Sequence, residues 1–386
     1  MGVLKAEPAR AQDWAARSVG AAWRAFDWQM LIFAVLLTGI GMAMAYSNTI
    51  AAGDPVFDPG STFGRGLIWC AFATIAFGVA TVFDYKWLRT FAWPLYFVNL
   101  AILIVTLGIG DGVSGAARWI ALGPFQFQFS ELAKILMIIV LANYLASRHE
   151  KLGSIWTILG ACLLTLPALI LVLLQPDLGT SLVLGGILAG MLFMSGSSLR
   201  WLAVLGGFVI AAVPFAWTYI LRDYQKQRLL SFLDPSADPQ GSGYQLLQSQ
   251  IAVGSGGLLG KGLTNGTQNQ LDFLPVQTTD FVFALLAEEL GFVGAILVFG
   301  LFLALVWRIL LTAWRSQDPF GLGIASGVAS MLLFQLVINV GMVIGIMPIT
   351  GIPLPFITHG GASLISIAVG LGVLQSVNVR QTRAEW

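Results

Sequence analysis

Charged residues are scarce in this chain of 386 residues. Only 10% of its side chains are charged, whereas soluble domains carry about 25%. The 20 lysines and arginines nearly balance the 19 aspartates and glutamates. The resulting net charge of +1 excludes the strongly basic surface that is typical of nucleic-acid-binding proteins. With 57% hydrophobic residues and a mean hydropathy of +0.82, too few polar side chains remain to cover a water-facing surface. The composition therefore predicts a protein embedded in membrane lipid.

The chain also has only two cysteines, Cys70 and Cys162, and both lie within apolar runs. Two such cysteines do not provide the paired framework that stabilises small secreted domains, and their spacing matches no zinc motif. We therefore expect neither a disulfide framework nor a metal cluster built on cysteine.

Long apolar runs are abundant. A helix that crosses the hydrocarbon core needs about 20 apolar residues, and ten segments meet or approach that length. The sequence therefore predicts an all-α integral membrane protein with about ten transmembrane helices. The segments are 28–48, 66–83, 91–109, 132–146, 154–174, 178–194, 199–221, 281–307, 320–346 and 361–379.

The distribution of basic residues predicts the orientation of these spans. With the N-terminus in the cytoplasm, 13 of the 20 basic residues fall on the cytoplasmic side, and an even number of spans returns the C-terminus there. Residues 1–27 are predicted to form a cytoplasmic segment, which either lies along the membrane interface or is a frayed tail. Residues 28–386 are then one polytopic domain.

The connection between the seventh and eighth spans, residues 222–280, is far longer than any other and lies on the extracytoplasmic side. Loops beyond about 15 residues are usually functional or disordered, and the apolar content here argues against disorder. The amphipathic stretch 244–251 and the apolar, glycine-rich run that follows it to Gly262 predict a segment that packs on the membrane surface or re-enters the membrane.

Ionisable residues within or next to spans are costly and are therefore functional candidates. Glu131 and Lys134 are spaced so that they share one face of a helix, which Ser130 is placed to cap. Two interpretations remain open. The pair either stabilises the helix entrance as a self-neutralising unit, or it forms with Arg118 a charged mouth for a phosphorylated ligand.

Two aspartates follow breaks in the apolar pattern. Asp177, after Gln175-Pro176, either caps the next helix or contacts a cation or substrate. Asp280, at the start of the eighth span, is either a helix cap or a general base. Glu288 lies two turns further along and is expected on about the same side as Asp280. With Glu289 beside it, it could share a proton, a cation or a basic partner.

The long loop also carries basic residues, among them Arg228 and Lys261, the latter within the glycine run 254–262. This run is not a nucleotide-binding P-loop, because Ser255 and Gly262 occupy positions where that motif requires glycine and serine or threonine. The glycines either let backbone amides approach a pyrophosphate or allow close helix packing. We predict Asp177, Arg228, Lys261 and Glu288 as substrate-binding residues.

The order of motifs along the chain resembles the SEDS family of bacterial peptidoglycan glycosyltransferases, across essentially all ten spans. The stretch 266–270 resembles the elongation branch, RodA, more than the division branch, FtsW. The other motifs that carry the resemblance are 175–181, 224–228, 232–235, 238–244, 248–252, 254–257, 260–262, 273–275, 279–281, 287–291 and 353–355.

The resemblance implies an enzyme that polymerises lipid II, with undecaprenyl pyrophosphate leaving, at the outer face of the bacterial cytoplasmic (inner) membrane. It places the family's essential aspartate at Asp280, as general base or as ligand of a divalent cation, Mg²⁺ or Mn²⁺. It places Arg118, Glu131 and Lys134 around the pyrophosphate. It also implies a class B penicillin-binding protein as partner and a role in cell elongation and shape.

Three motifs depart from the family pattern. Val276, Gln277 and Thr278 stand where Glu-x-His is usual, Phe129 replaces a proline before Ser130, and Thr358-His359 replaces the usual pair before the last Gly-Gly. These departures keep open a non-catalytic scaffold for a penicillin-binding protein. A flippase for lipid-linked precursors also stays open, because a transporter would likewise have many spans, broken helices and buried charges. A flippase would need a polar path through the membrane, whereas the candidate charges gather in the outer third.

Overall fold

The computed structural model describes residues 25–109, 120–122, 125–219, 221–238, 241–270, 280–358 and 360–381. Arg118 and Thr278, together with residues 1–24, lie outside these ranges, so the predictions made for them stay predictions.

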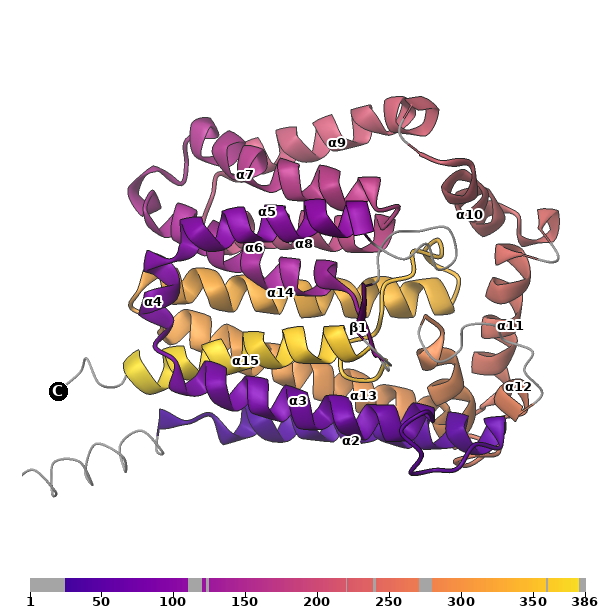
Figure 1. Cartoon of the computed structure of the whole chain (residues 1–386). Helices are drawn as coiled ribbons and strands as arrows, with labels where there is room; N and C mark the ends of the chain where they lie inside the picture. Colours follow the sequence, from indigo (N-terminus) through magenta and orange to yellow (C-terminus); the bar gives the residue numbers. More distant parts are fainter. Residues whose placement is uncertain are drawn as a thin grey trace, which may run out of the picture.

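Apolar helices lie side by side across the described chain (Figure 1). Eight are long enough to cross a membrane and two are shorter, so the ten predicted segments are all helical and the all-α prediction is confirmed. The ten are α2 (Trp28–Ala52), α3 (Thr62–Val82), α5 (Ala92–Ile109), α6 (Phe129–Ala146), α7 (Ile155–Leu174), α8 (Leu178–Met194), α9 (Leu199–Tyr219), α13 (Val282–Arg315), α14 (Pro319–Val343) and α15 (Gly361–Gln381).

The two ends of this bundle differ in what they carry (Figure 1). Helix α2 begins and α15 finishes at one end, here called the terminal end, beside the short helices α4 (Tyr85–Thr90) and η2 (His149–Lys151). The opposite end, the loop end, carries α10 (Asp223–Leu233), η3 (Pro235–Ala237), α11 (Ser242–Ser255) and α12 (Thr267–Gln270). Both described chain ends therefore share one end of the bundle, as an even number of spans requires.

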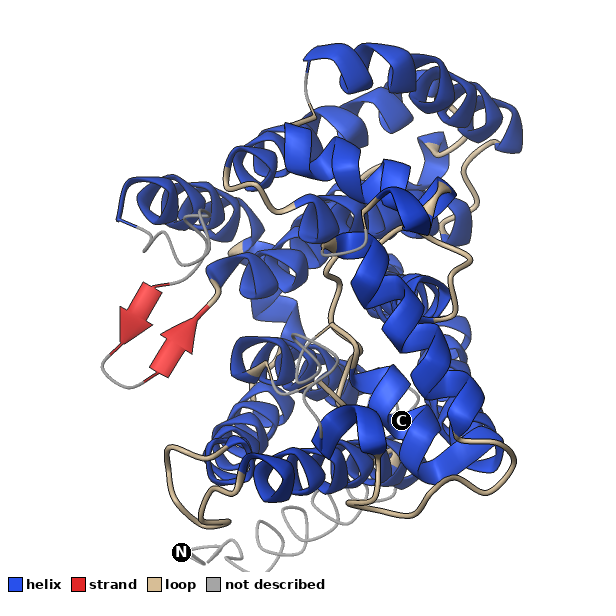
Figure 2. Cartoon of the chain, turned by 90° about the vertical axis from the view of Figure 1, so that its right-hand side faces the viewer, coloured by secondary structure: helices blue, strands red, loops and turns tan. Residues whose placement is uncertain are grey.

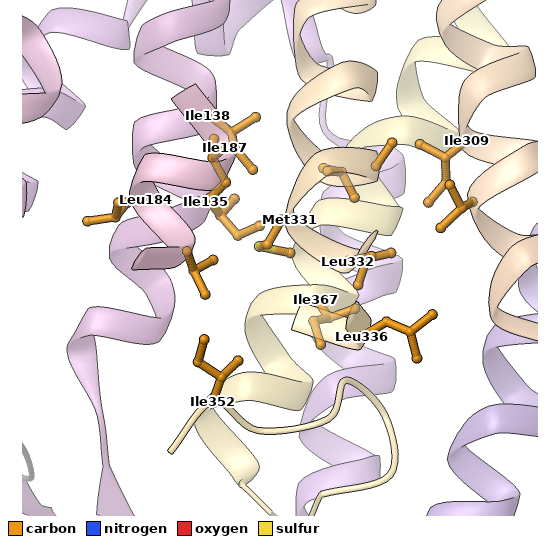
Figure 3. Packing of buried hydrophobic residues seen from close by; sticks show 14 of the residues in the cluster. Ile135, Ile138, Leu184, Ile187, Ile309, Met331, Leu332, Leu336, Ile352 and Ile367 are labelled. Atoms are coloured by element: carbon orange, nitrogen blue, oxygen red, sulfur yellow. The ribbon is translucent and has the colours of Figure 1, made fainter. Parts of the chain in front are cut away.

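Small residues let the central helices approach closely. Gly323 and Gly327 of α14 lie against Ala142 and Ile138 of α6, where a Cβ would collide with the neighbouring helix. Without a hydrophobic driving force in lipid, such close packing is a main source of helix association. Between these helices the core is apolar, as Ile135, Ile138, Met331 and Leu332 show (Figure 3). By contrast, α9 buries none of its residues and lies at the periphery.

Helix α13 is not one straight helix, because the predicted span 281–307 is divided in two at Gly291. The backbone at Gly291 leaves the helical region, with φ 66° and ψ −166°. Phe283 and Phe299 have ring centroids 5.9 Å apart, whereas about 24 Å would separate them along a continuous helix. The chain therefore folds back at Gly291. Residues 282–290 form a short half-helix that packs on the longer helix beginning at Phe292.

The long loop packs against the bundle instead of lying only on the membrane. Helix α11 contains the predicted amphipathic stretch and buries one face, including Leu246 and Ser249, against α13 and α14. The Ser249 hydroxyl donates to the carbonyl of Val343 at 2.9 Å. The element that re-enters the bundle is the half-helix 282–290, which directly follows the loop, and not the 244–262 stretch that the sequence suggested.

A small hairpin is the one β-structure in the described part of the chain. Strands β1 (Ile120–Leu122) and β2 (Phe125–Phe127) pair antiparallel, with Ile120 opposite Phe127, immediately before α6. Figure 2 looks onto the loop end and shows this hairpin standing away from the helices. The sequence analysis did not predict it.

Candidate active site

Asp280 is held in place by an amide on a neighbouring helix. The Nδ2 of Asn339 on α14 donates to the backbone carbonyl of Asp280 at 3.1 Å and to that of Ile352 at 2.7 Å. Asn339 is fully buried. One side chain thus fixes two segments, the entrance to the half-helix and the connection between α14 and α15.

Gly351 lies between Asp280 and Arg228. A Cβ built on Gly351 would lie 3.4 Å from Oδ2 of Asp280 and 3.8 Å from Nη1 of Arg228. The φ of Gly351 is +72°, a backbone conformation that favours glycine. The side chains of Asp280 and Arg228 therefore lie close to the same glycine. This agrees with the sequence prediction, which assigned both residues to one site.

Helix α10 carries Arg228 to this place. The Tyr224 hydroxyl, one turn earlier, donates to the carbonyl of Pro176 at 3.0 Å, and the Arg228 guanidinium lies 5.9 Å from the centroid of the Tyr224 ring. Helix α10 therefore spans the distance from the break between α7 and α8 to Asp280. The break itself is strained, since Pro176 has a φ of 29°.

Asp177 caps α8, as one of its two interpretations predicted. Its Oδ1 accepts from the backbone N–H of Thr180 at 3.1 Å. Its Oδ2 accepts from Nε2 of Gln128 at 2.8 Å and from the Ser130 hydroxyl at 3.3 Å. Ser130 does not cap α6, because the helix begins at Phe129 and the hydroxyl donates to Asp177 instead. The carboxylate joins the starts of α6 and α8.

Glu131 and Lys134 form a buried ion pair next to this junction. Nζ of Lys134 lies 2.8 Å from Oε2 of Glu131, and the two side chains are 2% and 3% exposed. Taking both charges out of water is costly, and the pair offsets part of that cost. The self-neutralising pair of the first interpretation is therefore present, while Arg118, the third charge of the second interpretation, lies outside the described residues.

Glu288 and Lys261 form a second ion pair, at the far end of the half-helix from Asp280. Oε1 of Glu288 accepts from Nζ of Lys261 at 2.7 Å and from the N–H and hydroxyl of Thr267 at 2.9 Å. Glu289 accepts instead from the Ser47 hydroxyl. Glu288 lies two turns along the half-helix from Asp280 and binds Lys261 and Thr267, so the expectation that it faces the same side as Asp280 stays a prediction.

The glycine run serves helix packing and not an open anion site. The backbone amides of Lys261 and Gly262 donate to the carbonyls of Glu288 and Glu289, both at 3.0 Å. These bonds satisfy carbonyls that the end of the half-helix would leave unpaired. Of the two interpretations of this run, the structure supports close packing.

Asn339 is the site residue that the sequence analysis missed. That search was restricted to ionisable residues within spans. A neutral amide within an apolar helix also requires a hydrogen-bond partner. Asn339 could therefore have been identified as an amide side chain within the apolar segment 320–346.

The described residues contain no group of three or more histidine, cysteine, aspartate or glutamate side chains that could hold a metal ion. Magnesium is commonly bound through one or two carboxylates together with the phosphates of a substrate. Asp280 fits such a shared site, as the single carboxylate facing Gly351.

Comparison with known proteins places the chain in a family. The family described as "Cell cycle protein", whose model carries the names FtsW, RodA and SpoVE, matches residues 27–383. The chain belongs to this family. The SEDS resemblance of the sequence motifs is thereby confirmed, and a protein of this family with ten apolar helices is a multi-pass membrane protein.

Individual relatives agree with this assignment. The chain is 42% identical to "Peptidoglycan glycosyltransferase MrdB" of Escherichia coli (strain K12) over 289 residues, which cover 74% of this chain and 77% of the relative. It is 37% identical over 360 residues to "Probable peptidoglycan glycosyltransferase FtsW" of Geobacter metallireducens, covering 92% and 95%.

Solved structures of this family share the fold. The "Rod shape determining protein RodA" of Thermus thermophilus matches with a TM-score of 0.69 and 31% identity, covering 92% of this chain and 97% of that one. A chain from a study of "polymerization and crosslinking by a peptidoglycan synthase complex" matches with a TM-score of 0.77 and 32% identity, covering 92% and 98%.

Proposed function

We propose that this SEDS protein is a peptidoglycan glycosyltransferase that polymerises lipid II during cell elongation. The names of the relatives support the reaction class. The observation that carries the proposal is the position of Asp280, which Asn339 holds beside Arg228 at the start of a half-helix inside the bundle.

The charges around Asp280 suit a transfer from a lipid pyrophosphate. The acceptor sugar hydroxyl attacks the anomeric carbon of the donor, its proton passes to the Asp280 carboxylate, and the lipid pyrophosphate leaves. Arg228 and the positive end of the half-helix offer charge to the departing anion. Lys134 and Glu131, one helix away, contribute the predicted pyrophosphate contacts together with Arg118, while Asp177 fixes the helix starts on which the pair is carried.

A divalent cation, Mg²⁺ or Mn²⁺, belongs to this proposal. Asp280 is the residue that would hold it, together with pyrophosphate oxygens of the substrate. Bound there, the ion would neutralise charge that develops on the leaving group. Lys261 and Glu288 act at a distance in this scheme, because their ion pair anchors the loop that covers the half-helix.

A flippase is the less favoured function. Such a protein needs a polar path between the two membrane faces. Between the start of α6 and the terminal end, α6, α8 and α14 pack on one another through apolar side chains such as Ile138, Ile187 and Met331 (Figure 3). The described core therefore favours a platform at one face of the membrane over a conduit.

The cellular setting follows from the same proposal. The loop end faces the outside of the bacterial cytoplasmic membrane, and both termini are cytoplasmic, as the basic residues predict. A class B penicillin-binding protein is the proposed partner. One solved relative comes from a complex that couples polymerisation to cross-linking, which supports this pairing.

The test is a polymerisation assay with purified full-length chain, its partner, Mn²⁺ and labelled lipid II. Intact protein is expected to make glycan strands, and Asp280→Asn is expected to make none while keeping the parent's thermal stability. Asp223→Asn, which changes a fully exposed carboxylate on α10, is the matched control and should polymerise like the parent. Polymerisation by Asp280→Asn at the parent's rate, or none by the parent, would reject the enzyme and favour the scaffold.

A further inference from the structure

One face of α14 carries buried amide atoms that have no partner. In the described part of the chain, neither Nε2 nor Oε1 of Gln335 has a hydrogen-bond partner, and the side chain is fully buried. One turn closer to the loop end, Oδ1 of Asn339 is also unpartnered, although its Nδ2 binds the Asp280 and Ile352 carbonyls. Leaving such a group unsatisfied costs about 1–3 kcal/mol, and native proteins contain few of them.

Helix register gives the depth of these amides in the bundle. Residues 335 and 339 lie four apart and therefore on one face of α14. Because α14 runs antiparallel to α6, with Gly327 against Ile138 and Gly323 against Ala142, residue 335 falls at the depth of residue 130. Gln335 is thus at the same depth as the start of α6, which carries Glu131, while Asn339 binds the backbone carbonyl of Asp280.

The chemistry of the unpartnered atoms selects the kind of ligand. The two carbonyls at Nδ2 fix the orientation of the Asn339 amide, so Oδ1 can only accept. Gln335 adds an acceptor oxygen and a donor nitrogen with two N–H groups, whichever way its amide is turned. A ligand that satisfies this set must donate at least two hydrogen bonds and accept one. An ionised pyrophosphate has no hydrogen to donate, whereas a sugar with hydroxyl and acetamido groups does both.

We propose that Gln335 and Oδ1 of Asn339 form a sugar-binding subsite, which recognises hydroxyl or acetamido groups of the lipid-linked saccharide between Asp280 and the Glu131–Lys134 pair. This inference rests on the proposed function and extends it. Pyrophosphate is bound by the charged residues, and the sugar is bound by neutral amides on α14. Such a division lets the site hold a saccharide against Asp280 without adding charge to the apolar bundle.

Binding measurements separate the two kinds of contact. All proteins compared are full-length and carry Asp280→Asn, so that lipid II is not consumed. The test variant carries Gln335→Leu in addition. Dissociation constants are measured in nanodiscs for a short-chain lipid II and for the matching prenyl pyrophosphate without sugar. Loss of about two hydrogen bonds is expected to weaken lipid II binding about tenfold or more and to change prenyl pyrophosphate binding less than twofold.

A matched control is available on α5. Asn99 is also buried and its Nδ2 is also unpartnered, but it lies on a helix that carries no site residue. Asn99→Leu should leave both dissociation constants unchanged. Thermal unfolding checks the fold of each variant, and Gln335→Met is measured in place of Gln335→Leu if the leucine variant does not fold.

The outcomes are distinguishable. Lipid II binding unchanged by Gln335→Leu, or both ligands weakened equally, overturns the sugar subsite. An unchanged affinity together with lower thermal stability assigns Gln335 a structural role, bound to water, and also overturns it. If the chain with Asp280 intact binds lipid II through Gln335 but makes no glycan, the proposed enzymatic function fails while the subsite stands.

Discussion

Phe283 and Phe299 pack edge to face with ring centroids 5.9 Å apart, because the chain reverses between them at Gly291. This reversal turns the start of α13 into a half-helix and places Asp280 inside the bundle instead of at its rim. Broken helices of this kind direct their N-termini at ligands in many membrane transporters. Here the break positions the residue proposed to act as general base.

Gly291→Ala is therefore expected to disrupt the site from a distance. A Cβ at φ +66° is strained, by about 1–3 kcal/mol, and it would also collide with the backbone N of Gly260. We expect a clear fall in thermal stability in detergent and loss of polymerisation. Gly300→Ala, in the helical part of α13 with open space around it, is the control and should be neutral or slightly stabilising.

The ten helices could be predicted because each is an apolar run of nearly membrane-spanning length. The reversal at Gly291 could not be predicted, since residues 281–307 are long and apolar enough for one span despite Glu288 and Glu289, and a glycine within a helix is usually tolerated. Tertiary contacts with the preceding loop decide the fold at Gly291. The backbone of residues 257–262 binds residues 288–293 and satisfies the broken helix ends.

Asn339→Asp tests whether the amide positions Asp280. The substitution keeps the shape but replaces the donor by an oxygen that faces the carbonyls of Asp280 and Ile352, each costing about 1–3 kcal/mol when unpaired. We expect kcat to fall about tenfold or more and hydrogen exchange in residues 349–356 to increase. A variant with lower thermal stability but the parent's kcat would show that Asn339 has only a structural role.

The charged residues of the site could be predicted from the sequence. Asp177, Glu131, Lys134 and Asp280 are all rare charges near spans, and the capping role of Asp177 is confirmed. Sequence spacing could not show that Arg228 meets Asp280 over Gly351, because α10 and the connection after α14 are far apart along the chain. It also could not show that Lys261 and Glu288 bind each other.

Lys134→Met should leave Glu131 as a buried charge without its partner, which costs about 3–5 kcal/mol. The double variant Glu131→Gln/Lys134→Met should regain most of that stability. If the pair contacts pyrophosphate, the double variant stays at least about tenfold slower than the parent, and if it is only structural, activity returns with stability. Lys226→Met, which breaks a 3.8 Å pair with the fully exposed Asp223, is the control and should change stability by less than about 1 kcal/mol.

Chelation of divalent cations is expected to stop polymerisation without loosening the protein. In the proposed mechanism the cation is shared between Asp280 and the substrate's pyrophosphate and is not held by the protein alone. EDTA should therefore leave the melting temperature of substrate-free protein within error, abolish glycan formation, and remove the extra stability that lipid II and Mn²⁺ together provide. Asp280→Asn should lack that cation-dependent gain even before EDTA is added. A fall in the melting temperature of substrate-free protein on chelation would instead reveal a resident metal site, and the shared site at Asp280 would be wrong.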